Sequence, residues 1–162
     1  MPRRPHPDQI ELGIGAPEPA VEAFAALVGE REGGWVNLLP EVEEDEARAV
    51  TPSPVAALFR APGPPIPQAT LIAPKAGRRG DAPAQVGLTH GVGTRVVGRL
   101  ASEGVVLPEG WSVVQDHVRR GVVLKLEDPV DAAQAIAWAL QAATALCPIR
   151  TTGAWLAEVH RP

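Results

Sequence analysis

The residues best suited to chemistry lie in a glycine-containing loop near the middle of the chain. The segment Gly87-Leu88-Thr89-His90-Gly91-Val92-Gly93-Thr94 follows a predicted strand and leads into a predicted helix. A turn of this kind can present backbone N–H groups to an anion at the start of a helix. We therefore predict an anion or phosphate site formed by Gly91, Gly93, Thr94 and Arg95.

The same glycines have a second, purely structural interpretation. A dinucleotide-binding loop requires glycine three residues after Gly93, where this chain has Val96. The Gly-Lys-Ser/Thr tripeptide of phosphate-binding loops is missing from the sequence. A tight turn that needs glycine for its backbone angles or for close packing explains the pattern equally well. Both interpretations stay open at this point.

Two histidines are candidates for acid–base chemistry, His90 in the loop and His117 in the segment Gln115-Asp116-His117-Val118-Arg119-Arg120-Gly121. Asp116 and His117 are adjacent, so on a strand their side chains point to opposite faces and do not pair. If the two loops converge, His90 and His117 form an acid–base pair that works near neutral pH. The alternative for the second segment is a hairpin tip with solvated charges.

Motifs for metal binding and nucleophilic catalysis are missing from the sequence. His-x-His, His-x-x-x-His and His-Glu-x-x-His spacings do not occur, and neither does Gly-x-Ser-x-Gly. The one cysteine, Cys147, falls at the end of a predicted apolar helix, where a buried and inert thiol is typical. We therefore expect no cofactor and no metal, and only His90 and His117 remain as candidate catalytic residues.

Composition limits the classes of partner. The 162 residues carry a net charge of −4, and the isoelectric point of about 5.6 is low for a nucleic-acid-binding domain. Two phenylalanines and no tyrosine leave little for base stacking. No apolar run approaches the roughly 18 residues of a membrane span, and the first residues lack the apolar segment of a secretory signal. We expect a soluble cytoplasmic protein that binds neither nucleic acid nor membrane.

Hydrophobic periodicity and breaker residues predict helices and strands that do not strictly alternate. Helices are predicted at 17–31, from the acidic run Glu41-Val42-Glu43-Glu44-Asp45-Glu46 to Ala49, at 55–60, 94–103 and 129–146. Strands are predicted at 35–39, 70–73, 85–88, 111–115, 122–126 and 155–159. The strands at 111–115 and 122–126 form a hairpin that turns near 119–121. Asp128 is the predicted N-cap of the last helix, with Pro129 at its first position.

The order of these elements favours the α+β class. We predict a single domain with a mostly antiparallel sheet of about four to six strands and helices packed mainly on one face. Residues 1–16 are predicted as an N-terminal arm and 17–162 as the domain, with 61–68 a proline-rich connector between its halves. Three tryptophans near glycines, Trp35, Trp111 and Trp155, raise the hypothesis of a weak helix–strand repeat, against which chance is a fair alternative.

Two functional hypotheses follow. The first is a non-enzymatic binding or interaction module that self-associates, because the 129–146 helix is apolar around much of its circumference and could be buried on two sides, in part by a homodimer interface. A different protein could bind the same surface in place of a second copy. The alternative is a small enzyme or ligand-binding domain with its anion site at the Gly87–Arg95 loop.

Overall fold

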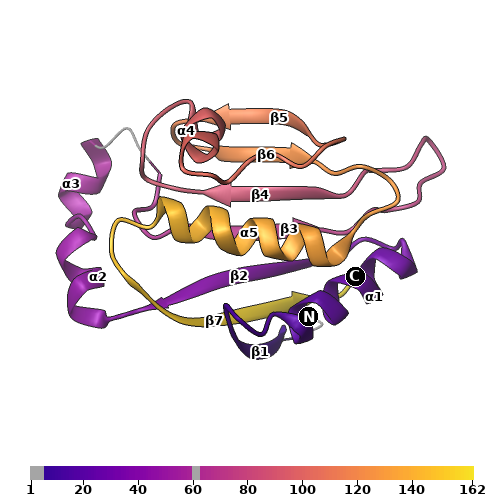
Figure 1. Cartoon of the computed structure of the whole chain (residues 1–162), viewed down its shortest axis with the longest axis horizontal. Coiled ribbons are helices and arrows are strands. Elements are labelled where there is room, and N and C mark those ends of the chain that lie inside the picture. The colour runs from indigo at the N-terminus through magenta and orange to yellow at the C-terminus, as the bar shows by residue number, and fades with distance from the viewer. Residues whose placement is uncertain (1–5, 60–62) are drawn as a thin grey trace.

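Seven strands pair into one antiparallel sheet, shown in Figure 1. The computed structural model describes residues 6–59 and 63–162. The strands are β1 (Asp8–Gly13), β2 (Trp35–Val42), β3 (Gln68–Ile72), β4 (Gln85–Thr89), β5 (Ser112–His117), β6 (Gly121–Lys125) and β7 (Thr151–His160). Their order across the sheet is β1-β7-β2-β3-β4-β6-β5, so β3 is the central strand.

Three of the helices cover one face of this sheet. The described residues form α1 (Glu18–Glu30), α2 (Glu44–Val50), α3 (Pro54–Phe59), α4 (Val96–Ser102) and α5 (Ala132–Leu146). Figure 1 shows α1, α4 and α5 on the same side of the strands, whereas α2 and α3 lie beyond one end of β2. The predicted α+β class is confirmed, with helices packed mainly on one face. None of the helices described is long and apolar enough to cross a membrane.

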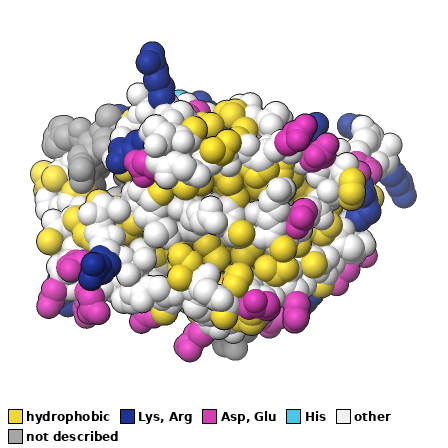
Figure 2. All heavy atoms as spheres, in the orientation of Figure 1, with side chains coloured by type: hydrophobic (Ala, Val, Ile, Leu, Met, Phe, Trp, Pro, Cys, Tyr) yellow, Lys and Arg dark blue, Asp and Glu magenta, His cyan; other side chains and the backbone are white. Residues whose placement is uncertain are grey.

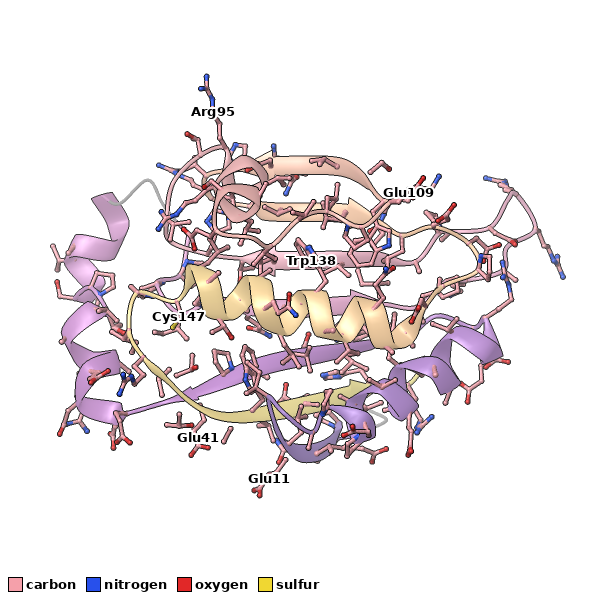
Figure 3. All side chains as sticks on the ribbon, in the orientation of Figure 1. Glu11, Glu41, Arg95, Glu109, Trp138 and Cys147 are labelled. Atoms are coloured by element: carbon pink, nitrogen blue, oxygen red, sulfur yellow. The ribbon has the colours of Figure 1, made fainter. Side chains whose placement is uncertain are left out.

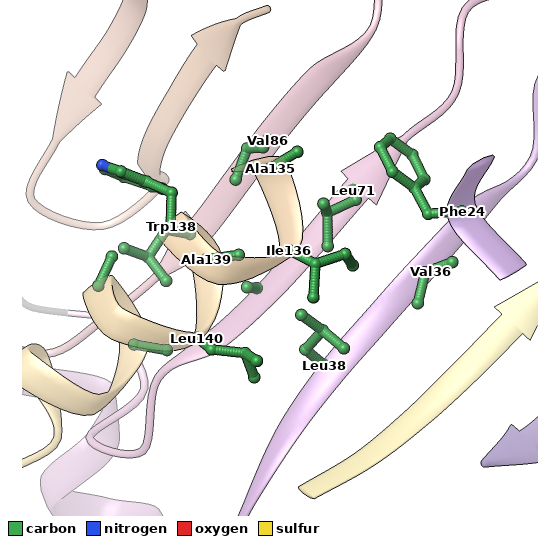
Figure 4. Packing of buried hydrophobic residues seen from close by; sticks show 14 of the residues in the cluster. Phe24, Val36, Leu38, Leu71, Val86, Ala135, Ile136, Trp138, Ala139 and Leu140 are labelled. Atoms are coloured by element: carbon green, nitrogen blue, oxygen red, sulfur yellow. The ribbon is translucent and has the colours of Figure 1, made fainter. Parts of the chain in front are cut away.

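The core forms between α5 and the central strands. Val36 and Leu38 on β2, and Leu71 on β3, are fully buried because alternate strand residues point toward the helices. Ile136 and Ala139 of α5 pack onto them, and the small alanines of this helix allow it to lie close to the sheet (Figure 4). The tight fit of such an interior makes the loss of even a few methyl groups costly.

The two-sided burial predicted for α5 is achieved within one chain. The helix contacts α1 along one flank and α4 along the other. On the α4 side the Trp138 indole N–H donates to the Val106 carbonyl at 3.1 Å, and the rings of Trp111 and Trp138 lie 5.7 Å apart. Figure 2 shows apolar side chains in patches between polar ones on this face. Most of the apolar circumference of α5 is nevertheless buried within the chain.

Residues 8–13, expected to be part of a polar arm, instead form the edge strand β1. Asp8 pairs with Val159 and Gly13 with Ala154, so the strand is completed by the far end of the chain. Leu12 is buried and Ile10 is partly buried, both on the helix-covered face. The missed strand is one reason why the sheet has seven strands rather than four to six.

Two predicted helix starts are also shifted. Helix α5 begins at Ala132, because Asp131 rather than Asp128 accepts the N–H of Gln134, at 2.9 Å. Of the acidic run, Glu41 and Val42 continue β2, and α2 begins only at Glu44. Charge alone predicted the helix, but pairing with β7 extends the strand through this segment.

The connector and the tryptophan repeat can also be compared with the structure. Residues 61 and 62 of the predicted connector lie outside the described residues, and 63–67 lead into β3 without forming a helix or a strand. The three tryptophans occupy different positions: Trp35 is exposed at the start of β2, Trp111 is buried before β5, and Trp155 is buried inside β7. They are not equivalent positions of a repeat.

Replacing Ile136 by Ala should lower the free energy of unfolding by about 2–5 kcal/mol, because the deleted methylenes leave a cavity between α5 and the sheet. Urea unfolding followed by far-ultraviolet circular dichroism measures this change. The matched control is Val106→Ala, since the Val106 side chain is 65% exposed, and its effect should stay within about 0.5 kcal/mol. Equal effects of the two substitutions would contradict the packing described here.

Candidate functional site

His90 and Asp116 come together at one end of the sheet, on the face that the helices cover. His90 follows β4 and is 1% exposed, and Asp116 lies on β5. The Asp116 carboxylate accepts the N–H of Val97 at 3.1 Å and so fixes the start of α4. It also acts electrostatically on the His90 imidazole. The strand order β4-β6-β5 places these two residues near each other although 26 positions separate them in the sequence.

Three polar atoms of this pair are buried without a hydrogen-bond partner: both ring nitrogens of His90 and the second carboxylate oxygen of Asp116. Unsatisfied buried polar atoms are rare in folded proteins and cost about 1–3 kcal/mol each. Burial lowers the pKa of His90 below its usual value, and the nearby Asp116 carboxylate only partly offsets this effect. The pair therefore favours a neutral imidazole.

A strap formed by residues 63–67 passes beside the backbone of His90 and Gly91 and leads into β3. The Gly63 N–H donates to the Val118 carbonyl at 3.2 Å, which ties the strap to the β5–β6 hairpin. A side chain at Gly91 would lie 3.1 Å from the Pro64 carbonyl and from the Pro65 Cα, closer than most real Cβ contacts. Glycine at position 91 therefore allows the strap to approach, which supports the structural interpretation of this residue.

The other residues of the predicted anion site lie at the surface. Gly93 has a φ of +103°, Thr94 is exposed, and Arg95 has a left-handed backbone with a φ of +57°. Figure 3 shows the Arg95 side chain extending away from the molecule. The N–H of Val97 at the start of α4, which an incoming anion would use, is already bonded to the Asp116 carboxylate. The phosphate site remains a prediction, and this geometry does not favour it.

His117 has a different role from His90. Its Nδ1 accepts the backbone N–H groups of Arg119 and Arg120, at 3.1 and 3.3 Å, and thereby stabilises the hairpin turn. Strand alternation directs Asp116 toward the helices and His117 toward the opposite face of the sheet. The structure therefore does not bring the two candidate imidazoles together, and no group of metal-ligating side chains is found among the residues described.

The face of the sheet opposite the helices carries a set of residues that the sequence analysis missed. We call it the open face. The rings of Trp35 and His160 stack at 4.6 Å with an angle of 11° between their planes. Asn37 Nδ2 lies 3.4 Å from His160 Nε2, and the Thr70 hydroxyl donates to Asn37 Oδ1 at 2.9 Å. The signal was present in the alternation of Trp35-Val36-Asn37 and Glu158-Val159-His160, where every second side chain is apolar and buried.

Comparisons with known families, curated proteins and solved structures found no match for this chain.

Replacing His90 by Leu should reduce the dependence of stability on pH. Because the folded-state pKa of His90 lies below its unfolded value of about 6.5, the folded protein binds fewer protons, and stability is lost as pH falls below about 6.5. One such group changes the free energy of unfolding by at most about 1.4 kcal/mol per pH unit. Urea unfolding between pH 8 and pH 5 should show a smaller loss for the variant than for the wild type.

The control for this experiment is His6→Gln, which removes an imidazole at an exposed position. At pH 8 the His90→Leu variant should be at least as stable as the wild type, because it removes the two unsatisfied ring nitrogens of His90. A pH dependence identical to that of the wild type would show that His90 does not resist protonation in the folded state.

Proposed function

We propose that this protein is a non-enzymatic interaction module that self-associates through the open face of its sheet. The observation that carries the proposal is the exposure of two large apolar neighbours on that face. Trp35 is 40% exposed and Ile72 is 39% exposed, and they are directly paired across β2 and β3. The other three tryptophans are at most 9% exposed. An exposed tryptophan beside an exposed isoleucine is typical of an interface.

The hydrogen bonds around Trp35 support an interface that is already organised. Stacking on His160 fixes the plane of the indole, and the contacts from Thr70 through Asn37 to His160 hold the imidazole in place. Side chains that are already ordered lose less conformational entropy on binding. Gln9 donates to Glu158 at 3.4 Å and extends the ordered polar set to the edge strand.

The two alternatives have less support. An enzymatic role at the Gly87–Arg95 loop would need His90 to reach a substrate, and the His90 side chain is buried. Self-association through α5 is less well supported, because α1 and α4 already cover the two flanks of that helix within the chain. A cytoplasmic location is part of this proposal and still depends on the sequence alone.

Sedimentation equilibrium should detect a reversible dimer of the wild-type chain, and Trp35→Glu should weaken it. Tryptophans at the centre of interfaces contribute about 2 kcal/mol or more, so the dissociation constant should rise on the order of thirtyfold. The matched control is Val106→Glu, which adds the same charge at an exposed apolar position on the helix-covered side of the molecule. A wild-type chain that stays monomeric to millimolar concentration, or equal effects of the two variants, would refute the proposal.

A further inference from the structure

We propose that the two copies are related by a twofold axis parallel to the strands and centred on β3, so that Trp35 of each copy packs over the Gln85–Gly87 segment of the other. This inference rests on the proposed self-association and adds the arrangement of the partner. It follows from three features of the open face: the position of β3, a glycine inside β4, and the distribution of charge across the strands.

The strand order fixes which strands face each other in such a dimer. Because β3 is fourth of seven, a twofold axis along it places β2 over β4 and β7 over β6. The register keeps residues of one row together: Trp35, Ile72 and Gln85 lie side by side on adjacent strands. The two exposed isoleucines at position 72 then meet at the axis, and each indole meets the partner's β4. Face-to-face sheets of this kind pack about 10 Å apart.

Gly87 leaves room on the open face where the partner's indole arrives. It lies in the interior of β4, where glycine weakens a strand and often marks a close approach by another chain. A Cβ built at this position would touch only the Thr70 carbonyl, at 3.8 Å, so nothing in the chain itself requires glycine here. The free space above Gly87 lies one row of side chains away from Trp35. Gly87 pairs with Thr70, and Thr70 pairs with Asn37, which is two residues after Trp35 on β2.

Charge selects this axis over its alternative. On the open face, Glu11 and Glu158 lie on β1 and β7, whereas Lys125 lies on β6 at the opposite side. An axis parallel to the strands brings β6 of one copy over β7 of the other. Lys125 then lies opposite His160 of the second copy and one row of side chains from its Glu158. An axis perpendicular to the strands would place β7 over β7 and Glu158 against its own copy, which like-charge repulsion disfavours.

The area of the face is sufficient for a reversible dimer. Seven strands about 4.8 Å apart and about five residues long present roughly 500 Å² of flat surface per copy. Side chains add to this figure, so the interface buries on the order of 1,000 Å² in total, close to the lower limit for specific association.

Gly87→Val tests the packing of the indole. Valine favours the strand conformation and has space in the single chain, so circular dichroism and urea unfolding should show an intact fold at least as stable as the wild type. Sedimentation equilibrium should show the dissociation constant raised at least tenfold, because the added side chain fills the gap that receives Trp35. A Gly87→Val chain that dimerises like the wild type would overturn the arrangement.

Paired charge reversals test the axis. Lys125→Glu and Glu158→Lys each create two like-charge contacts in a homodimer, and each should weaken association about tenfold at low salt. An equimolar mixture of the two variants should form a heterodimer with wild-type affinity, because both contacts then regain opposite charges. A mixture no tighter than either variant alone would overturn the axis. If Trp35→Glu still dissociates the dimer in that case, the proposed function stands and only this arrangement fails.

Discussion

The register of the seven strands is the constraint on which the rest of this molecule depends. In the central strands alternate apolar residues fall on the helix-covered face, so that Val36, Leu71, Val86 and Leu124 form one continuous surface under α5. A shift of one residue in any pair would turn its apolar side chains to the other face. The cost of exposing them and of burying their polar neighbours makes this register, and therefore the placement of α5, strongly preferred.

The same alternation determines what the open face can do. Because the helices lie on one side, every second residue of the sheet is left facing solvent, and those positions carry a stacked Trp35–His160 pair, ordered amides and separated charges. An antiparallel sheet commonly has one solvated face, but such a face is usually polar throughout. The exposed Trp35 and Ile72 in adjacent strands depart from that pattern. His90 and Asp116 are unusual on the covered face, which is otherwise largely apolar. Their unsatisfied polar atoms reduce stability.

Local elements of this fold could be predicted from the sequence, and distant pairings could not. The β5–β6 hairpin and the body of α5 were predicted because turn residues and a helical apolar stripe lie within each segment. Strand β1 was missed because its partner, β7, lies almost the whole chain length away. His90 was identified as a candidate residue, but its neighbour Asp116 depends on the strand order β4-β6-β5, which no local pattern encodes. The open face could not be predicted, because the sequence alone does not show which side of the sheet the helices cover.

In the proposed dimer a second copy of the chain covers the open face in solution. Hydroxyl-radical footprinting over a range of protein concentrations, read by mass spectrometry, tests it most directly because it reports the exposure of individual side chains. We expect the oxidation of Trp35 and Ile72 to fall as protein concentration rises, while the oxidation of Val106 on the helix-covered side of the molecule stays constant. Protection at Val106 with unchanged oxidation of Trp35 would contradict it.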